Sequence, residues 1–493
     1  MKKLRKALAI LIASVLSIGS LAACDLSFLG GGKESSAPTE NSSIVETSSG
    51  AETETSSESE EETSSEEHTC VYEGDWKSNK TGHWRVCSCG KLGDYAKHTG
   101  EAADCESLPV CTTCEVEYGT APGHSYGTLS DGVNGMAYYC DCGAYITNND
   151  LVDFVVEVEA DRDPVVLQLS DTQIMNYGSA EELCYRYIRD AVNATNPDLI
   201  LITGDVVYGK FDPNGSILKD LIRFMETLKT PWAPVFGNHD NESEMGVDWQ
   251  CQQFEAAEYC LFKQGDLTGN GNYSVGIEQG GELMRVFYML DSNGCGGASE
   301  ASLPKIQKDA GFGDDQKMWF INSIEEIKSC SPDTKFSLAY HIQIAQFRKA
   351  FEKYDEYNDL YVSGSSLENP VNLDTLESAE EGDFGFIGAM LKGPWDTTYT
   401  LAKRVKELGV DSHFVGHEHC NSASIVLEGV RYQYGQKSSQ YDRYNIQLDD
   451  GSIVVNTKTE EKGTPLMGGT AIVLSKQDGS IIDGYIHLYD FGQ

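Results

Sequence analysis

The C-terminal two thirds of the chain alternates short apolar runs with longer amphipathic stretches. Residues 165–169, 199–202 and 232–236 are dense in valine, leucine, isoleucine and other apolar residues, which predicts buried strands. Residues 179–193 and 217–229 lie between these runs and predict helices, the first of which opens with serine followed by acidic residues. Strands that alternate with helices in this way predict a layered α/β fold.

Further strands are expected toward the C-terminus, at residues 285–290, 335–340 and 413–415. Together with the first three they indicate mixed sheets packed as a sandwich. A chain of 493 residues is also too long for one ordinary core, so we expect more than one domain.

The N-terminus has a different pattern, a basic stretch at residues 1–6 followed by an apolar stretch at residues 7–21, which is typical of a secretory signal. It ends in Leu21-Ala22-Ala23-Cys24, which resembles the bacterial lipobox, whose cysteine is acylated and becomes the first residue of the mature protein. We therefore predict a lipoprotein signal peptide at residues 1–23 and an extracytoplasmic protein anchored to the cell membrane through Cys24. The alternatives are an ordinary signal peptide or a short membrane anchor.

Residues 24–67 consist mainly of serine, threonine, glutamate and glycine. Such a segment cannot bury enough apolar surface to offset the entropy of ordering the chain. It is predicted to be a disordered linker that separates the following domains from the membrane.

Residues 68–150 form a third compositional region, in which eight cysteines and four histidines recur in a repeated arrangement. Cys-x2-Cys followed by histidine suits a structural zinc site, whereas an even number of cysteines in a small exported module is also typical of disulfides. Both interpretations stay open for Cys87, Cys89, Cys111, Cys114, His124, Cys140 and Cys142. The region resembles the small Cys/His repeats of some bacterial surface proteins, so a cell-surface partner is a hypothesis for it.

The formal net charge of −40 restricts the partners of the whole chain. A surface this acidic repels the phosphates of DNA and RNA, so we expect no nucleic-acid binding. A site for a small anionic substrate would need local positive charge, which bound metal ions can provide.

Polar residues follow the predicted strands of the remaining region, 151–493. The expected strand ends are followed by Asp171 and Gln173, by Asp205, by Asn238-His239-Asp240, by His341, and by His417 and His419. Loops beyond the carboxyl ends of strands gather at one edge of an α/β sheet, so these residues are expected in one site. Carboxylate, imidazole and amide donors suit two adjacent metal ions, which can bind a phosphate and activate water.

These blocks resemble the D-x-H, G-D, G-N-H-D, H and G-H-x-H signature of the calcineurin-like metallophosphoesterases, over residues 163–493. The resemblance implies a four-layer α/β/β/α sandwich with mixed sheets. It also implies that Asp205 bridges two ions, that a hydroxide between them attacks phosphorus in line, and that His239, paired with Asp240, is the general acid. The metal ligands it implies are Asp171, Gln173, Asp205 and His419 for the first ion, and Asp205, Asn238, His341 and His417 for the second.

Additional motifs resemble the branch of the family that contains purple-acid-phosphatase-like proteins. They are Gly271-Asn272-Tyr273-Ser274, Leu290-Asp291-Ser292, Gln316-x2-Trp319-Phe320 and Tyr434-Gly435. This likeness favours a phosphomonoesterase that acts on a small phosphorylated substrate. A phosphodiesterase for nucleotides or glycerophosphodiesters is the alternative.

Gln173 departs from the family pattern, which usually has histidine there. An amide oxygen is a harder and weaker donor than imidazole, so an oxygen-rich first site favours Mn, Mg or Fe over Zn. Two divalent metal ions are expected in all, and the candidates are Mn, Fe, Zn and Mg. If Gln173 does not bind a metal, one ion is held loosely and the enzyme is slow. The alternative from another class, supported by Gln173 and the Cys/His region, is a surface binding protein with a degenerate phosphoesterase domain.

Overall fold

The computed structural model describes residues 68–175, 178–294, 297–303, 310–354, 361–363, 370–372, 382–385, 387, 399–419, 421–439, 444–449, 452–456 and 464–488. The predicted signal peptide, Cys24 and the predicted linker lie outside these residues. Among the residues described, no helix combines the length and apolar character needed to cross a bilayer. The chain divides into two compact units, with the boundary between Ser125 and Tyr126.

The first unit contains a small antiparallel sheet and long connecting loops. Its strands are β1 (Lys77–Ser78), β2 (Gly82–Val86) and β3 (Leu92–Lys97), with β2 in the centre. Among its described residues, 68–125, few large apolar side chains are buried, and Leu92 and Tyr95 are both more than half exposed. The unit therefore has little apolar core of its own.

The second unit begins with a small sheet that packs on the main body. Its strands are β4 (Tyr126–Gly132), β5 (Gly135–Cys140) and β6 (Tyr145–Ile146), and the short helix α2 (Asn148–Leu151) follows. Tyr138 is buried and donates a hydrogen bond to Asn148 Oδ1 at 3.0 Å. Asn148 in turn donates to Glu278 and to the carbonyl of Gly281. These bonds tie residues 126–151 to the sheet that follows.

Two mixed sheets form the main body. The five-stranded sheet has the order β10-β9-β8-β22-β23, and its strands are β8 (Val165–Leu169), β9 (Leu199–Thr203), β10 (Trp232–Val235), β22 (Gly468–Leu474) and β23 (Ile481–Leu488). The seven-stranded sheet has the order β17-β18-β16-β13-β12-β11-β7, and its strands are β7 (Phe154–Val158), β11 (Tyr273–Gln279), β12 (Glu282–Met289), β13 (Lys335–Ala339), β16 (Val410–Val415), β17 (Ser424–Leu427) and β18 (Val430–Tyr434).

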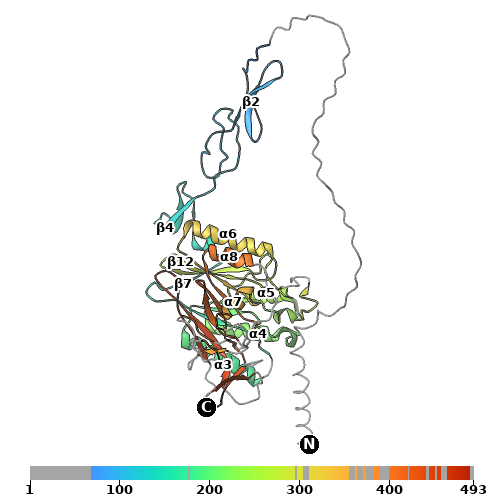
Figure 1. Cartoon of the computed structure of the whole chain (residues 1–493), viewed down its shortest axis with the longest axis vertical. Helices are drawn as coiled ribbons and strands as arrows, with labels where there is room; N and C mark the ends of the chain where they lie inside the picture. The colour runs from blue at the N-terminus through green and yellow to red at the C-terminus, as the bar shows by residue number, and fades with distance from the viewer. Residues whose placement is uncertain are drawn as a thin grey trace, which may run out of the picture. The chain divides into compact units, whose positions relative to one another are not determined.

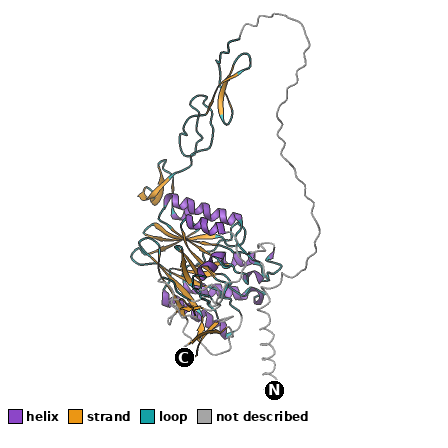
Figure 2. Cartoon of the chain, in the orientation of Figure 1, coloured by secondary structure: helices purple, strands orange, loops and turns teal. Residues whose placement is uncertain are grey.

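Helices cover the outer faces of both sheets, as the colours of Figure 2 show. The five-stranded sheet is covered by α3 (Ser179–Thr195) and α4 (Ser216–Leu228), with α5 (Val247–Glu255) beside them. The seven-stranded sheet is covered by α6 (Asp314–Cys330), α7 (Ala345–Phe351) and α8 (Tyr399–Glu407), and Figure 1 shows α6 and α8 lying together next to β12. The expected α/β/β/α sandwich with mixed sheets is confirmed.

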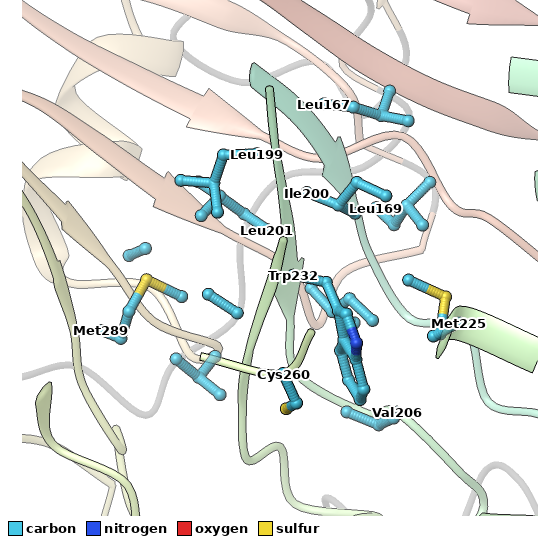
Figure 3. Packing of buried hydrophobic residues seen from close by; sticks show 14 of the residues in the cluster. Leu167, Leu169, Leu199, Ile200, Leu201, Val206, Met225, Trp232, Cys260 and Met289 are labelled. Carbon is cyan, nitrogen blue, oxygen red and sulfur yellow. The ribbon is translucent and has the colours of Figure 1, made fainter. Parts of the chain in front are cut away.

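Side chains that alternate along β12 contribute to two different hydrophobic cores. Phe287 and Met289 belong to the core between the sheets, whereas Val286 and Tyr288 pack under α6, because successive side chains of a strand point to opposite faces. In Figure 3, Met289 lies on one side of the strands β8 and β9, and Met225 of α4 lies on the other.

The remaining elements are short. They are the 3-10 helices η1 (Gly209–Phe211) and η2 (Asp240–Glu242), the pair β14 (Tyr361–Ser363) and β15 (Pro370–Asn372), and a sheet of β19 (Tyr444–Asp449), β20 (Ser452–Asn456) and β21 (Thr464–Leu466). Of these, η1 and η2 lie next to each other and follow two of the polar blocks.

Candidate metal centre

The candidate ligands follow the carboxyl ends of strands in both sheets. Asp171 and Asp205 each come two residues after a strand, β8 and β9, which are parallel neighbours. Asn238 follows β10, which is parallel to β9. His341 and His417 each come two residues after β13 and β16, which are parallel neighbours in the other sheet. The site therefore draws its residues from both halves of the sandwich.

Short distances join these residues across the two sheets. His341 Nε2 lies 3.3 Å from Asp205 Oδ2 and 3.2 Å from Asn238 Oδ1. His419 Nε2 lies 3.4 Å from Asp171 Oδ1, and the ligand atoms of Asp171, Asp205 and His419 all lie within 4.8 Å of one another. The ring centres of His341 and His417 are 5.2 Å apart. The residues taken from the sequence blocks thus come together in one site.

The donor set fits divalent cations. Asp171, Asp205 and His341 are buried, and their oxygen and nitrogen atoms converge from different loops. Two carboxylates, imidazoles and an amide oxygen are the donors that bind Mn, Fe, Zn or Mg in proteins. Buried carboxylates this close together need a compensating positive charge.

The pKa values show how the charges in the site compensate one another. Burial alone would raise the pKa of Asp171, but His419 and His341 lower it to about 2. Burial would likewise raise the pKa of Asp205, and His341 and His239 hold it well below the usual range. Burial would lower the pKa of His341, but the two carboxylates raise it to about 9. A metal ion binds neutral imidazole, so binding at His341 would release this proton.

Backbone strain is concentrated at the same residues. Among the described residues, ten non-glycine residues have a positive φ, and four of these are Asp171 (48°), Gln173 (38°), Asp205 (48°) and His417 (80°). Left-handed backbone of this kind costs free energy in residues other than glycine, and it persists where the surrounding structure imposes it, often at functional sites.

Three glycines beside the ligands allow candidate ligand side chains to lie directly against the backbone. A Cβ atom on Gly237 would lie 2.2 Å from Asp205 Oδ1, and one on Gly416 would lie 2.8 Å from Asp171 Oδ2. Gly204 has a φ of +86°, and its Cβ would lie 2.4 Å from His341 Nδ1. A side chain at any of these three positions would displace a candidate ligand.

Gln173 has a partner that the sequence blocks do not reveal. Its Oε1 accepts a hydrogen bond from Lys437 Nζ at 2.9 Å, and its Nε2 donates to Asp205 Oδ2 at 3.2 Å. Lys437 is completely buried and also donates to the carbonyl of Asp171 at 3.0 Å. The amide oxygen that a metal would need therefore already accepts one hydrogen bond from an ammonium group.

Lys437 reaches the site because the chain crosses between the sheets after β18. Ser438 N donates to the carbonyl of Ser170 at 2.9 Å, which joins this crossing segment to the end of β8. The motif Tyr434-Gly435 drew attention to this part of the sequence, but Lys437 itself belongs to no block of the family signature. Only the crossing places it beside Gln173.

The pairing expected between His239 and Asp240 is wrong. The Asp240 carboxylate accepts hydrogen bonds from the backbone N–H groups of Val206, Val207 and Gly237, at 3.1, 3.0 and 2.8 Å. It fixes the Asp205 and Asn238 loops against each other. The Asp240 side chain therefore faces these backbone amides, whereas His239, which precedes η2, lies beside another carboxylate.

Glu242 takes the place expected for Asp240. Glu242 Oε2 lies 3.2 Å from His239 Nδ1, an ion-pair distance without the alignment of a hydrogen bond. The His239 ring stacks on Tyr208, with ring centres 4.2 Å apart. Burial would lower the pKa of His239, but the negative charges of Asp205 and Glu242 raise it.

The additional motifs form a buried polar network behind His341. Asn272 Oδ1 accepts from Gln316 Nε2 at 2.6 Å and from the N–H of Asp291. Ser292 Oγ accepts from the backbone N–H of Ile342 at 2.9 Å. These residues therefore support the loop that carries His341 and are separate from the candidate ligands.

Comparisons with known proteins identify the family to which the chain belongs. The family model described as calcineurin-like phosphoesterase matches residues 164–421. The chain is 24% identical over 279 residues to an Arabidopsis thaliana protein named probable inactive purple acid phosphatase 29, a match that covers 50% of this chain and 61% of that protein. It is 27% identical over 119 residues to the Saccharomyces cerevisiae phosphatase DCR2, covering 22% of this chain and 20% of that protein. The chain thus spans less than two thirds of these relatives.

The fold is also similar to that of solved structures. One is a dimetal phosphatase from Danio rerio, which is 10% identical, with a TM-score of 0.35, over 67% of this chain and 100% of that one. A purple acid phosphatase from yellow lupin is also 10% identical, with a TM-score of 0.31, over 83% of this chain and 69% of that one. Because the family model spans more than half of the chain, the protein belongs to the calcineurin-like phosphoesterase family, whose general activity is metal-dependent hydrolysis of phosphoesters.

Proposed function

We propose that this protein is a phosphomonoesterase that uses two divalent metal ions and works outside the cytoplasm. The observation that carries the proposal is the meeting of Asp171, Asp205 and His341 from both sheets, with distances of 3.2–3.4 Å linking Asp205 to His341, His341 to Asn238 and Asp171 to His419. A donor set of this composition holds cations and would attract a phosphate to them.

The two ions would share Asp205. Asp171 and His419 would complete the first site, and Asn238, His341 and His417 would complete the second. Bound ions of this kind neutralise phosphate charge and lower the pKa of water, which supplies the nucleophile for hydrolysis.

His239 would donate a proton to the leaving oxygen. The negative charges of Asp205 and Glu242 raise its pKa in the metal-free site, and its ring stacks on Tyr208. Glu242 stabilises the protonated form. His239 would therefore act as general acid, with Glu242 as its partner.

The substrate proposed is a small phosphate monoester. The resemblance of the motifs around Asn272, Asp291 and Gln316 to purple-acid-phosphatase-like proteins favours a monoester over a diester. A phosphodiesterase acting on nucleotides or glycerophosphodiesters is the alternative within the same chemistry.

The place of action is also part of the proposal. Acylation of Cys24 would tether the enzyme to the outer face of the cell membrane. Substitution Cys24→Ser should move the protein from the membrane fraction to the soluble fraction, measured by fractionation of expressing cells. Persistence of the variant in the membrane fraction would contradict acylation.

One observation favours a second candidate, a surface binding protein with a degenerate site. Lys437 donates a hydrogen bond to the amide oxygen of Gln173 and brings a positive charge beside it, which would weaken Gln173 as a ligand of the first ion. The Arabidopsis relative also carries the word inactive in its name. Under this alternative the protein would bind a metal or a phosphate ester without turnover.

The test is hydrolysis of p-nitrophenyl phosphate and of bis-p-nitrophenyl phosphate by the purified protein, with Mn, Fe, Zn or Mg added in turn. The proposal expects metal-dependent turnover that prefers the monoester. Asp205→Asn should reduce kcat by about 10²-fold or more, because it removes the carboxylate shared by both ions. Preference for the diester would select the phosphodiesterase, and binding of metal without turnover would select the binding protein.

A further inference from the structure

The first compact unit contains two groups of cysteine and histidine side chains far from the candidate metal centre in sequence. The first group is His68, Cys70, Cys87 and Cys89, whose ligand atoms all lie within 4.8 Å of one another. His68 Nε2 lies 3.0 Å from Cys87 Sγ, and Cys70 Sγ lies 3.6 Å from Cys89 Sγ. Three sulfurs and one imidazole nitrogen therefore face a common point.

The second group is His83, His98, Cys111 and Cys114, with the same convergence. Cys111 Sγ lies 3.5 Å from His83 Nδ1, and Cys114 Sγ lies 3.4 Å from His98 Nδ1. His83, His98 and Cys111 are buried, in a unit that buries few apolar side chains.

One ring nitrogen of the second group has a fixed protonation. His98 Nε2 lies 2.7 Å from the carbonyl oxygen of Asn79, which can only accept a hydrogen bond. Nε2 therefore carries the proton, and the lone pair is on Nδ1, the nitrogen that faces Cys114. A second hydrogen bond of this kind is the usual means of orienting a histidine that binds a metal.

Local backbone turns bring the cysteines together. Gly90 N donates to the carbonyl of Cys87 at 2.8 Å, which closes a turn over Cys87-Ser88-Cys89. Glu115 N donates to the carbonyl of Cys111 at 2.9 Å, which closes a turn over Cys111 to Cys114. In each group a tight turn supplies two thiols. The other two ligands come from one segment, residues 68–70, in the first group and from two segments, at His83 and at His98, in the second.

Disulfides explain this arrangement less completely than a metal does. The first group has three cysteines, so any disulfide within it leaves one thiol over, next to the His68 ring. In the second group a disulfide between Cys111 and Cys114 would leave two converging imidazoles without a common ligand. A tetrahedral ion uses all four side chains of each group.

We propose that residues 68–125 bind two structural zinc ions, one through His68, Cys70, Cys87 and Cys89 and one through His83, His98, Cys111 and Cys114. Three thiolates with one imidazole, and two thiolates with two imidazoles, are both donor sets of structural zinc sites. Because the unit has little apolar core, the ions supply the cross-links that hold its loops together.

The experiment replaces zinc by cobalt in the full-length protein, purified with its thiols reduced. Cobalt bound by thiolates gives an intense sulfur-to-metal charge-transfer absorption. The candidate metal centre cannot produce this signal because none of its donors is a cysteine. The proposal expects the absorption in the wild-type protein, its loss on addition of zinc, and a zinc content above that of the metal centre alone.

Matched variants assign the signal to each group. Cys87→Ser and Cys111→Ser should each lower the cobalt absorption, and the double variant should lower it by the sum of the two. Ser88→Ala and Thr113→Ala change the residues between the cysteines of each turn, and they should leave the absorption unchanged. Activity on p-nitrophenyl phosphate should be unaffected by any of the four, so failure of the phosphatase proposal would not affect this result.

Measurements on the wild-type protein keep the test valid if a variant does not fold. After isolation without reductant, the five cysteines of the two groups should be alkylated only when the protein is denatured with a chelator present. Cysteines that stay resistant to alkylation in denaturant and chelator, but react after reduction, would overturn the proposal in favour of disulfides. Absence of the cobalt absorption from reduced, folded protein would overturn it as well.

Discussion

At the scale of single residues, the contact between Lys437 and Gln173 decides how the first ion can be held. Lys437 brings a positive charge to the side of the site where Asp171, Asp205 and His419 converge. This ammonium partly neutralises the carboxylates of Asp171 and Asp205, and it repels the metal ion that they would bind. The first ion is therefore expected to bind more weakly than the second.

Removal of this charge should strengthen metal binding. Lys437→Met keeps the apolar stem of the side chain but deletes the ammonium. The larger of the two Mn²⁺ dissociation constants, that of the weaker site, should therefore fall by about tenfold, which corresponds to about 1.4 kcal/mol of binding free energy. Titration calorimetry on metal-free protein measures both constants. Lys476→Met changes a lysine that bonds to the carbonyl of Asp161 and should leave both constants unchanged. Weaker binding in Lys437→Met would show that the ammonium supports the site.

A second residue-scale prediction concerns His413, which is buried on β16. Burial lowers the pKa of His413 from 6.5 to about 3, and its Nδ1 forms a hydrogen bond with the Tyr340 hydroxyl at 3.1 Å. The unfolded chain would bind a proton near pH 6.5 and the folded chain would not, so His413 makes the protein less stable as pH falls below 6.5. The contribution reaches at most about 1.4 kcal/mol per pH unit.

His413→Gln, which retains a hydrogen-bond acceptor for Tyr340, should remove that part of the pH dependence. Urea unfolding of wild type and variant at several pH values between about 4.5 and 6.5 measures the difference in slope. Equal slopes in the two proteins would contradict the assignment.

At the scale of elements, a buried arginine joins the two sheets. Arg285 on β12 is completely buried and pairs through both terminal nitrogens with the Asp411 carboxylate on β16, at 2.7 Å each. Its Nε donates to the carbonyl of Gly479, in the turn between β22 and β23 of the other sheet. The guanidinium therefore connects strands of one sheet and ties that sheet to the next.

Asp411→Ala should destabilise the protein by about 2–4 kcal/mol, because it leaves a buried guanidinium without its counter-charge. The Asp411 side chain is 31% exposed, so water can reach part of the site and the lower half of this range is expected. Urea unfolding measures the change. Asp220→Ala breaks the exposed pair with Arg223 and should cost less than about 1 kcal/mol. Equal costs for the two substitutions would contradict the role of Arg285.

At the scale of the whole molecule, the boundary at Ser125 separates two units with different sources of stability. The second unit has two apolar cores, whereas the first buries mainly histidine and cysteine. The small sheet of β4, β5 and β6 packs with the second unit, through Tyr138 and through contacts between β4 and α6.

Two shortened chains should show whether the second unit begins at Tyr126 or at residue 151, where the sequence placed the start of the last domain. A chain that begins at Tyr126 should fold and retain kcat/KM for p-nitrophenyl phosphate within about twofold of the full protein. A chain that begins at Leu151 loses the buried Tyr138 ring and should be less stable by about 3–5 kcal/mol. Thermal unfolding and activity measure both. Equal stability of the two chains would contradict the packing role of β4–β6.

The sequence alone determined the main fold and most of the candidate site. Runs such as 165–169 and 199–202 correspond to β8 and β9, because a strand buried on both faces has few alternatives to an apolar composition. Asp171, Asp205 and His341 could be predicted together, because parallel strands place the residues after their carboxyl ends at a common edge.

Only the tertiary structure decided which polar groups contact each other. Lys437 meets Gln173 through a segment that crosses between the sheets, and Glu242 rather than Asp240 faces His239. The same holds for the first unit, where spacing could not assign His68 and His83 to separate groups. These hydrogen bonds and ligand sets form between residues that are distant in the chain. They depend on the path of the backbone in three dimensions, which local sequence patterns do not predict.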